Sequence, residues 1–118
     1  MDRRKLTGQL GETVAAAFLQ EQGVVILRRN YRCRFGEIDL IGRDGHTLVI
    51  IEVKARKKGA GAQAVDLRKQ KRICATLTWF RMKERIPEYV PVRFDVIEVD
   101  GAMKCRWIRN AFEYQELT

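Results

Sequence analysis

The feature that most constrains the fold is a short apolar run near the middle of the chain, from Leu48 to Lys54. Its side chains are apolar at odd and even positions alike, so a strand built from it would have two apolar faces. Such a strand needs cover on both sides, which predicts a central strand in a sheet flanked by helices. Glu52 and Lys54 are conspicuous because they carry charge within a strand that is otherwise apolar.

The segments around this strand indicate one α/β domain over residues 1–118. Apolar residues at helical spacing predict helices, and alternating or continuous apolar runs predict strands. Asp44-Gly45 between two apolar runs predicts a hairpin, and Asp66 is placed to cap a helix. We therefore expect a mixed sheet of about five strands flanked by helices. The expected elements are a helix over Thr7–Gln22, strands over Val24–Arg29, Phe35–Ile41 and Thr47–Ala55, a helix over Asp66–Lys83, and strands over Val92–Val99 and Met103–Ile108.

Composition excludes several classes of protein. Hydrophobic residues make up 46% of the chain and charged residues 32%, values that speak against disorder and against membrane insertion. No apolar run approaches the ~20 residues of a membrane helix, and polar residues and glycines interrupt the N-terminal segment where a signal peptide needs an apolar core. The three cysteines, Cys33, Cys74 and Cys105, form no Cys-x-x-Cys pair, so we expect reduced thiols. These observations predict a cytoplasmic protein without a membrane partner.

The net charge of +8 is concentrated in one part of the chain. Between Lys54 and Arg72 there are eight basic residues and a single acid, Asp66. A second basic cluster, without an acid among its members, lies between Arg28 and Arg34. Concentrated positive charge is typical of nucleic-acid-binding proteins, although a solvated basic face without a partner would have the same composition. We favour a polyanion as the partner of this surface.

Two pairs of charged residues fall on common strand faces. Alternation places Glu37 with Asp39 in one strand and Glu52 with Lys54 in the next, and the hairpin makes these faces neighbours. A carboxylate among buried apolar residues is costly unless it is paired or binds a cation. Pairing with Lys54 would neutralise one of Asp39 and Glu52 and leave the other. Two carboxylates beside a lysine also suit a hard cation such as Mg²⁺, and such a site could hydrolyse a phosphodiester.

Two segments in these strands resemble the active-site motif of the PD-(D/E)xK nuclease superfamily, namely Gly36-Glu37-Ile38-Asp39-Leu40-Ile41 and Glu52-Val53-Lys54. The whole chain resembles the small YraN-like family, whose members are similar to archaeal-type Holliday junction resolvases. The resemblance implies a restriction-endonuclease-like core. Further matching segments are Gly11-Glu12, Arg29-Asn30-Tyr31-Arg32, Arg93-Phe94-Asp95-Val96 and Asn110-Ala111-Phe112.

The resemblance also implies roles for individual residues. Asp39 and Glu52 would hold Mg²⁺ or Mn²⁺, with the carbonyl of Val53 as a third ligand, and Lys54 would be the catalytic lysine. Glu12 would reach the site from the first helix and join the catalytic group. The sequence pattern alone explains Glu12 differently, as an acid favoured by the helix dipole in the first turns of a helix.

The expected nucleic-acid contacts combine the basic clusters with the second helix. Helical periodicity places Lys69 toward the sheet rather than toward solvent. The resemblance implies that Lys69 matches a basic position found after the nuclease motif, with Gln70 as its neighbour. The residues expected to contact nucleic acid are Arg32, Arg34, Arg56, Lys57, Lys58, Lys69 and Gln70.

These expectations leave two classes of function open. One is a Mg²⁺- or Mn²⁺-dependent endonuclease acting on DNA, with branched or recombination intermediates as candidate substrates and a homodimer matching a two-fold junction. The other is a non-catalytic nucleic-acid-binding module on a nuclease scaffold, acting as a partner in DNA processing or uptake. An RNA-binding protein would share the charge, but the aromatic signature of RNA-recognition sheets is missing. Tyr31, Phe35 and Trp79 could stack on bases or belong to the core.

Overall fold

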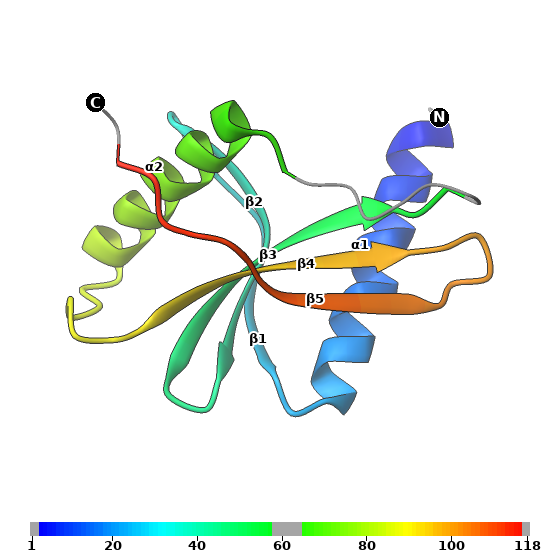
Figure 1. Ribbon diagram of the computed structural model, residues 1–118, viewed down its shortest axis with the longest axis horizontal. Helices are drawn as coiled ribbons and strands as arrows, with labels where there is room; N and C mark the ends of the chain where they lie inside the picture. Colours follow the sequence, from blue (N-terminus) through cyan, green and yellow to red (C-terminus); the bar gives the residue numbers. More distant parts are fainter. Residues whose placement is uncertain (1–2, 58–64, 117–118) are drawn as a thin grey trace.

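The computed structural model describes residues 3–57 and 65–116, and of residues 3–7 it describes the backbone alone. Its centre is a five-stranded sheet with the strand order β1-β2-β3-β4-β5 (Figure 1). Neighbouring strands are antiparallel except β3 and β4, whose parallel pairing requires the crossover that helix α2 supplies. The elements are α1 (Arg3–Glu21), β1 (Val25–Cys33), β2 (Gly36–Asp44), β3 (Thr47–Ala55), α2 (Leu67–Lys83), β4 (Val92–Val99) and β5 (Cys105–Phe112).

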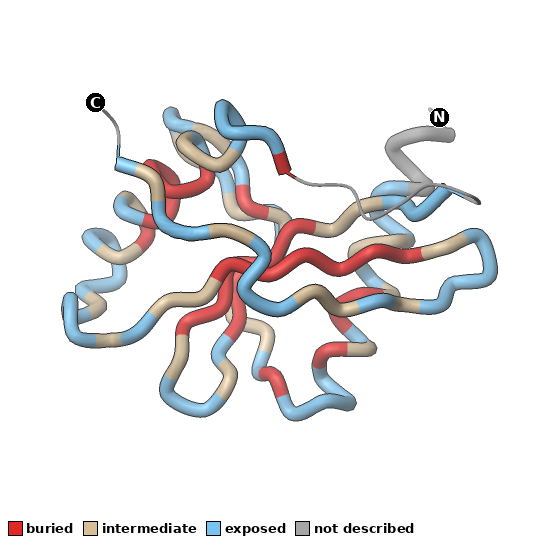
Figure 2. Tube along the Cα trace, viewed as in Figure 1, coloured by how far each residue is buried: buried red, intermediate tan, exposed pale blue. Residues whose placement is uncertain are grey.

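The residues of β3 alternate between two hydrophobic cores, one on each face of the sheet. Ile50 packs in the core that contains Leu77 of α2. The adjacent Ile51 packs in the other core, together with Leu19 of α1. Figure 2 shows buried residues concentrated along the central strands. The two-sided cover expected for the apolar run is confirmed, because every residue from Leu48 to Glu52 is buried.

The order of helices and strands agrees with the expectation, and the bounds of β3 and β4 agree residue for residue. Strand β1 is longer than expected because it continues to a two-residue turn, with Cys33 opposite Gly36. Strand β2 begins at Gly36 and continues past Ile41 to Asp44, which pairs with Thr47 across the next turn. Many side chains of β1 are exposed, so this strand lacks the apolar alternation that would have indicated its end. Helix α1 begins at Arg3 rather than near Thr7. The sequence did not predict this earlier start because the residues before Leu10 carry no apolar stripe.

The β2–β3 hairpin and the start of α2 form as their local sequences predict. Asp44 pairs with Thr47 across the hairpin, and Gly45 has a φ of 62°, a left-handed conformation that glycine adopts without strain. Asp66 caps α2, and its Oδ1 accepts a hydrogen bond from the N–H of Lys69 at 2.8 Å. The hairpin fixes the register of β2 against β3, and the cap fixes where α2 begins.

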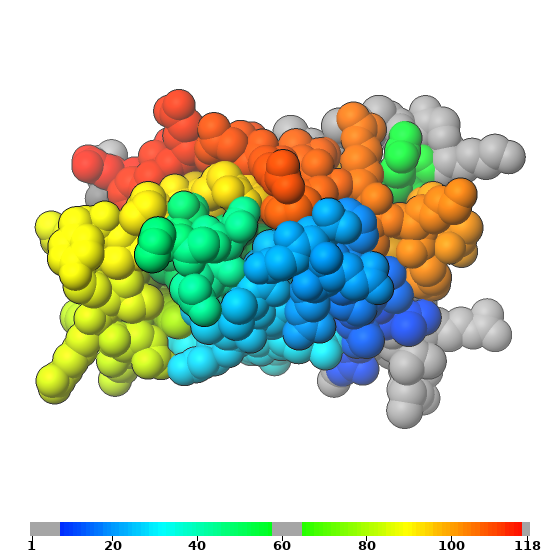
Figure 3. All heavy atoms as spheres, turned by 90° about the horizontal axis from the view of Figure 1, so that it is seen from below, coloured from blue at the N-terminus to red at the C-terminus, as the bar shows by residue number. Residues whose placement is uncertain are grey.

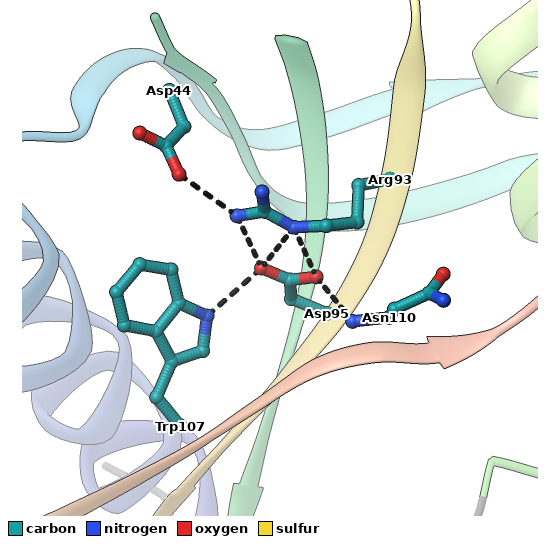
Figure 4. A network of polar contacts seen from close by, with 5 residues as sticks. All are labelled: Asp44, Arg93, Asp95, Trp107 and Asn110. Atoms are coloured by element: carbon teal, nitrogen blue, oxygen red, sulfur yellow. Dashed lines mark hydrogen bonds and ion pairs between the residues drawn. The ribbon is translucent and has the colours of Figure 1, made fainter.

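A polar network centred on the buried Asp95 joins β4 to β5 and to the β2–β3 turn (Figure 4). Asp95 is fully buried and accepts hydrogen bonds from Arg93 Nε at 2.9 Å, Trp107 Nε1 at 2.8 Å and the N–H of Asn110 at 2.9 Å. Arg93 also donates to Asp44 Oδ2 at 3.1 Å. The register of β4 against β5 shifts at this point, so the Asp95 side chain takes over bonds that a regular backbone ladder would make. Two motifs that are distant in the sequence therefore meet at one carboxylate.

Cys33, Cys74 and Cys105 are free thiols, as their spacing predicts, and Cys74 is the buried member of the three. None of the helices within residues 3–57 and 65–116 is long and apolar enough to cross a membrane.

Candidate active site

Asp39 and Glu52 lie where the backbone pairing of β2 with β3 ends. The last pair of this ladder is Leu40 with Ile51. Beyond it, the N–H of Val53 donates to Asp39 Oδ2 at 2.8 Å, and the N–H of Asp39 donates to Glu52 Oε2 at 3.2 Å. Each carboxylate is therefore fixed by the backbone of the opposite strand. The expectation that the hairpin brings these two acids together is confirmed.

Lys69 brings a positive charge to this pair from α2. Its ammonium group lies 3.1 Å from Glu52 Oε1. Because Asp66 sets the start of the helix, Lys69 is in its first turn and its side chain reaches the end of β3. The ammonium thus reaches the sheet as periodicity predicts, although the Lys69 side chain stays partly exposed to solvent. Pairing with Lys54 was one alternative that the sequence left open for these acids, and in the structure Lys69 forms an ion pair with Glu52.

Burial dominates the electrostatics of the two acids. The side chain of Glu52 is 2% exposed, and burial together with the nearby Asp39 raises the pKa of Glu52 to about 7, against the opposing influence of Lys69. Burial also raises the pKa of Asp39, although the bond from Val53 favours its charged form. For Lys69, burial lowers the pKa, but the neighbouring Glu52 outweighs burial and the net pKa is raised. A further positive charge at this point would favour the ionised form of both acids.

Glu12 approaches the pair from α1 and is also partly withdrawn from water. Its Oε2 is buried and accepts no hydrogen bond from the described part of the chain. Burial raises the pKa of Glu12, as do the negative charges of Asp39 and Glu37, while a hydrogen bond from Asn30 lowers it. Because α1 begins at Arg3, Glu12 lies well beyond the first turns, and its interpretation as a helix-dipole acid is wrong.

A pocket of about 680 Å³ opens beside these groups. It forms where the end of β3 meets α1, the first turn of α2 and the loop between β4 and β5. Four of its lining residues, Glu12, Asp39, Val53 and Lys54, are those for which the sequence predicts catalytic or metal-binding roles. The full lining consists of Gly8, Gly11, Glu12, Asp39, Val53, Lys54, Ala55, Arg56, Lys69, Val99, Asp100, Gly101 and Met103.

The basic residues expected to contact nucleic acid are divided between this pocket and its surroundings. Arg56 lines the pocket, and Lys57 follows it on the exposed segment after β3. Lys58 lies outside the described residues. The fold thus places Arg56 and Lys69 in the lining of the pocket that Asp39 and Glu12 also line.

The remaining expected contacts are not among the lining residues of the pocket. Arg32 and Arg34 are exposed near the β1–β2 turn, where Arg32 pairs with Glu37 at 3.4 Å. Gln70 is half-buried, and its Nε2 donates to the carbonyl of Val65 at 2.7 Å. Gln70 therefore braces the chain just before α2.

Asn30 is a neighbour of the site for which the sequence assigned no individual role. It hydrogen-bonds Glu12 and lies with it in a smaller pocket that also includes Arg32 and Glu37. Its φ of 52° is left-handed, a conformation in which asparagine is enriched among non-glycine residues. An asparagine inside an otherwise strand-like arginine segment is the signal that could have indicated this position.

The donor set of the site fits a hard divalent cation. The described residues contain no cluster of three or more His, Cys, Asp or Glu side chains that could hold a metal ion. Mg²⁺, however, keeps several waters and needs only one or two carboxylates, so Asp39, Glu52 and the Val53 carbonyl are a sufficient set. Two observations indicate that the site would be stabilised by a further positive charge. The buried Oε2 of Glu12 lacks a hydrogen-bond donor among the described residues, and the pKa of Glu52 is raised.

Comparison with known proteins places the chain in a family. The model of a family described as "Uncharacterised protein family UPF0102" matches residues 11–99. A UPF0102 protein of Lachnoclostridium phytofermentans is 45% identical over 113 residues, which cover 93% of this chain and 95% of that protein. A UPF0102 protein of Syntrophus aciditrophicus is 44% identical over 119 residues, covering 96% of this chain and 93% of its own length.

A third relative gives the same result at similar distance. A UPF0102 protein of Legionella pneumophila, strain Corby, is 40% identical over 110 residues, covering 90% of this chain and 93% of that protein. Similarity to this family is consistent with a nuclease-like protein. These matches include both strands of the candidate site, and the chain belongs to the UPF0102 family, the YraN family.

Proposed function

We propose that this protein is a Mg²⁺- or Mn²⁺-dependent endonuclease that hydrolyses phosphodiesters in DNA, with branched duplexes as its preferred class of substrate. One observation carries the proposal. Glu52 is buried and Asp39 is half-buried at the end of a strand pair, each is fixed by a backbone N–H of the other strand, and Lys69 lies beside them. A buried arrangement of this kind raises carboxyl pKa values and is costly to maintain, which suits a functional site better than a structural one.

Asp39, Glu52 and the Val53 carbonyl would hold the cation. When bound, this ion would polarise a phosphoryl oxygen and lower the pKa of a water molecule. Its positive charge would also keep Asp39 and Glu52 ionised. The reciprocal bonds from the backbone would hold both carboxylates in place without further reorganisation.

The basic residues of the pocket would act on the substrate itself. Lys54, which lines the pocket next to Val53, would orient the attacking water and stabilise negative charge on the phosphate as the bond breaks. Arg56, at the same rim, would bind a neighbouring phosphate and keep the scissile bond in position. The half-buried Glu12 would accept a hydrogen bond from the attacking water through its carboxylate. A homodimer would present two such sites to a two-fold symmetric junction.

A second candidate is binding to nucleic acid without cleavage. The contact that favours it is the ion pair of Lys69 with Glu52, which already neutralises one of the two carboxylates. In that case the basic rim would bind phosphates, and the affinity would fall steeply with added salt. Such a protein would bind junctions in the presence of any divalent cation and leave them intact.

Cleavage assays on four-way junction, flap and linear DNA with Mg²⁺ or Mn²⁺ distinguish the two candidates. The wild type should cut, Glu52→Gln should lose the activity, and Glu88→Gln, an exposed acid far from the pocket, should retain it. Salt-sensitive binding without product in either metal would establish the second candidate. Activity that survives Glu52→Gln would show that a contaminating nuclease is responsible.

A further inference from the structure

Two adjacent aromatic rings with a cation on each outer side lie on the surface formed by the β1–β2 turn and α2. We call it the cation–aromatic strip, and it consists of Arg34, Phe35, Trp79 and Lys83. The guanidinium of Arg34 lies 5.3 Å from the centre of the Phe35 ring. Phe35 meets Trp79 edge to face, with 5.9 Å between ring centres. The Lys83 ammonium lies 4.9 Å from the centre of the Trp79 ring.

The two rings of the strip are surface groups rather than members of the core. Phe35 is 40% exposed and Trp79 is half-buried. Neither ring belongs to the two clusters of core residues described above. Tyr31 differs, because it packs against the buried Phe80 with 5.1 Å between ring centres. The sequence left stacking and core packing open for these three aromatics, and the fold separates them.

The cations of the strip have their charge available for a ligand. Among the described residues, no carboxylate lies within ion-pair distance of Arg34 or Lys83. Arg28 differs from these two cations because it forms an ion pair with Glu84 at 2.9 Å. A cation held on a ring face keeps its full charge and is already positioned, so it can pair with a phosphate at little conformational cost.

The strip and the candidate active site use the same side of α2. Lys69, Trp79 and Lys83 recur at helical spacing and share that side, and the buried Thr76 lies between Lys69 and Trp79. Gly36 packs the β1–β2 turn closely on this helix, because a Cβ at Gly36 would lie 3.2 Å from Thr76 Oγ1. Figure 1 shows this turn beside α2. Trp79 is ten residues beyond Lys69, or about 15 Å along the helix axis.

We propose that the cation–aromatic strip binds unpaired nucleotides of a DNA strand whose duplex part enters the active site. Bases would stack on Phe35 and Trp79, and the flanking phosphates would pair with Arg34 and Lys83. The proposal rests on the proposed function for its class of substrate and adds a preference for single-stranded DNA next to the cleaved bond. Figure 3 shows the molecule from below, on the side where the β2–β3 turn lies.

Binding without metal tests the strip separately from catalysis. The probe is single-stranded oligothymidine of about 20 nucleotides, longer than the ~4–16 nucleotides covered by known single-strand-binding folds. With EDTA present, fluorescence anisotropy should show binding weakened about fivefold or more by Phe35→Ala and by Trp79→Ala. Tyr89→Ala, which removes an 85% exposed ring outside the strip, should leave the affinity unchanged. Tryptophan fluorescence should be quenched by the oligonucleotide in the wild type and not in Trp79→Phe.

Circular dichroism of each variant shows whether it is folded. The variants Arg34→Gln and Lys83→Gln provide a second test, because they remove a charge and leave both rings in place. Each should reduce the salt dependence of binding by about one phosphate contact. Wild-type affinity in Phe35→Ala and Trp79→Ala, or equal losses for single-stranded and duplex DNA, would overturn the proposal. Cleavage that depends on Glu52 would persist in that case, so the proposed function would stand. Ring-dependent binding without cleavage in Mg²⁺ or Mn²⁺ would instead support the strip and overturn the proposed function.

Discussion

The ammonium of Lys69 lies 3.1 Å from Oε1 of Glu52, so a cation from α2 already faces the carboxylate that we assign to a metal ion. The Lys69 side chain is 46% exposed, which gives it room to turn toward solvent or toward a phosphate. Glu52 has no such freedom, because it is buried and bonded to the N–H of Asp39. Lys69 is therefore the movable partner of a fixed acid, and its removal should expose the electrostatic cost of the site.

Lys69→Met should destabilise the metal-free protein, and more so at high pH. Lys69 lowers the pKa of Glu52, so its loss raises that pKa further and makes the ionised carboxylate costlier. Because Lys69 is partly exposed, we expect a loss of about 1 kcal/mol near pH 8 and a smaller loss near pH 5. Urea unfolding at both pH values measures the difference. Arg68→Met, at an exposed neighbouring position, should show no such pH dependence, and a loss independent of pH in Lys69→Met would contradict the expectation.

The raised pKa of Glu52 predicts how the stability of the metal-free protein varies with pH. The folded protein holds the Glu52 proton up to about pH 7, whereas an ordinary glutamate releases it near 4.5. The folded state thus binds more protons over this interval, and the contribution of Glu52 to stability falls as pH rises. The full shift corresponds to on the order of 3 kcal/mol.

The variant Glu52→Gln isolates this contribution. It should lose stability less steeply than the wild type between about pH 5 and pH 8, as measured by urea unfolding in EDTA. Glu88→Gln is the matched control because Glu88 is exposed. Parallel pH profiles for wild type and Glu52→Gln would show that Glu52 titrates normally.

Much of the site follows from strand alternation and one hairpin. The apolar run around Glu52 indicated the central strand, and Asp44-Gly45 brought Asp39 toward Glu52. Alternation could not show that the ladder stops at Leu40 and Ile51 and that side chains then bond to backbone. That exchange depends on the twist of two strands relative to each other, which a one-dimensional pattern does not contain.

Contacts between distant segments were the least predictable part. Periodicity gave the face of Lys69 but not its partner, because the crossover from β3 to α2 sets that distance. Alternation in β4 could not distinguish Asp95 from a solvent-facing acid, since its donors Trp107 and Asn110 come from β5. Glu12 required the true start of α1, which no apolar stripe marks.

Asp95→Ala should be strongly destabilising. It removes a fully buried carboxylate and leaves the Trp107 indole and the Asn110 N–H without their acceptor. Loss of one member of a buried ion pair costs about 3–5 kcal/mol. Asp44→Ala removes the more exposed partner of Arg93 and should cost less than about 1 kcal/mol. Urea unfolding of the two variants compares these costs, and equal losses would contradict the central place of Asp95 in the network.

Asp66→Ala should weaken the start of α2. Its Oδ1 accepts the N–H of Lys69, and loss of such a cap costs about 1 kcal/mol. Asp66→Ser can still accept this bond and should recover most of the loss. Urea unfolding measures both variants. Wild-type stability in Asp66→Ala would show that the cap does not hold this end of the helix.

A divalent cation should stabilise the folded protein through Asp39 and Glu52. At roughly ten times its dissociation constant, Mg²⁺ would add about 1.4 kcal/mol, which raises the unfolding temperature by several degrees. Calorimetry with Mg²⁺ and with EDTA measures this rise, which should disappear in Asp39→Asn because the carboxylate bonded to Val53 is lost. Asp100→Asn changes an acid that lines the same pocket and keeps an oxygen for the N–H groups of its loop, so the rise should persist there. A rise that survives Asp39→Asn would place the cation elsewhere, whereas its loss in that variant alone would link cation binding to the bonded carboxylates.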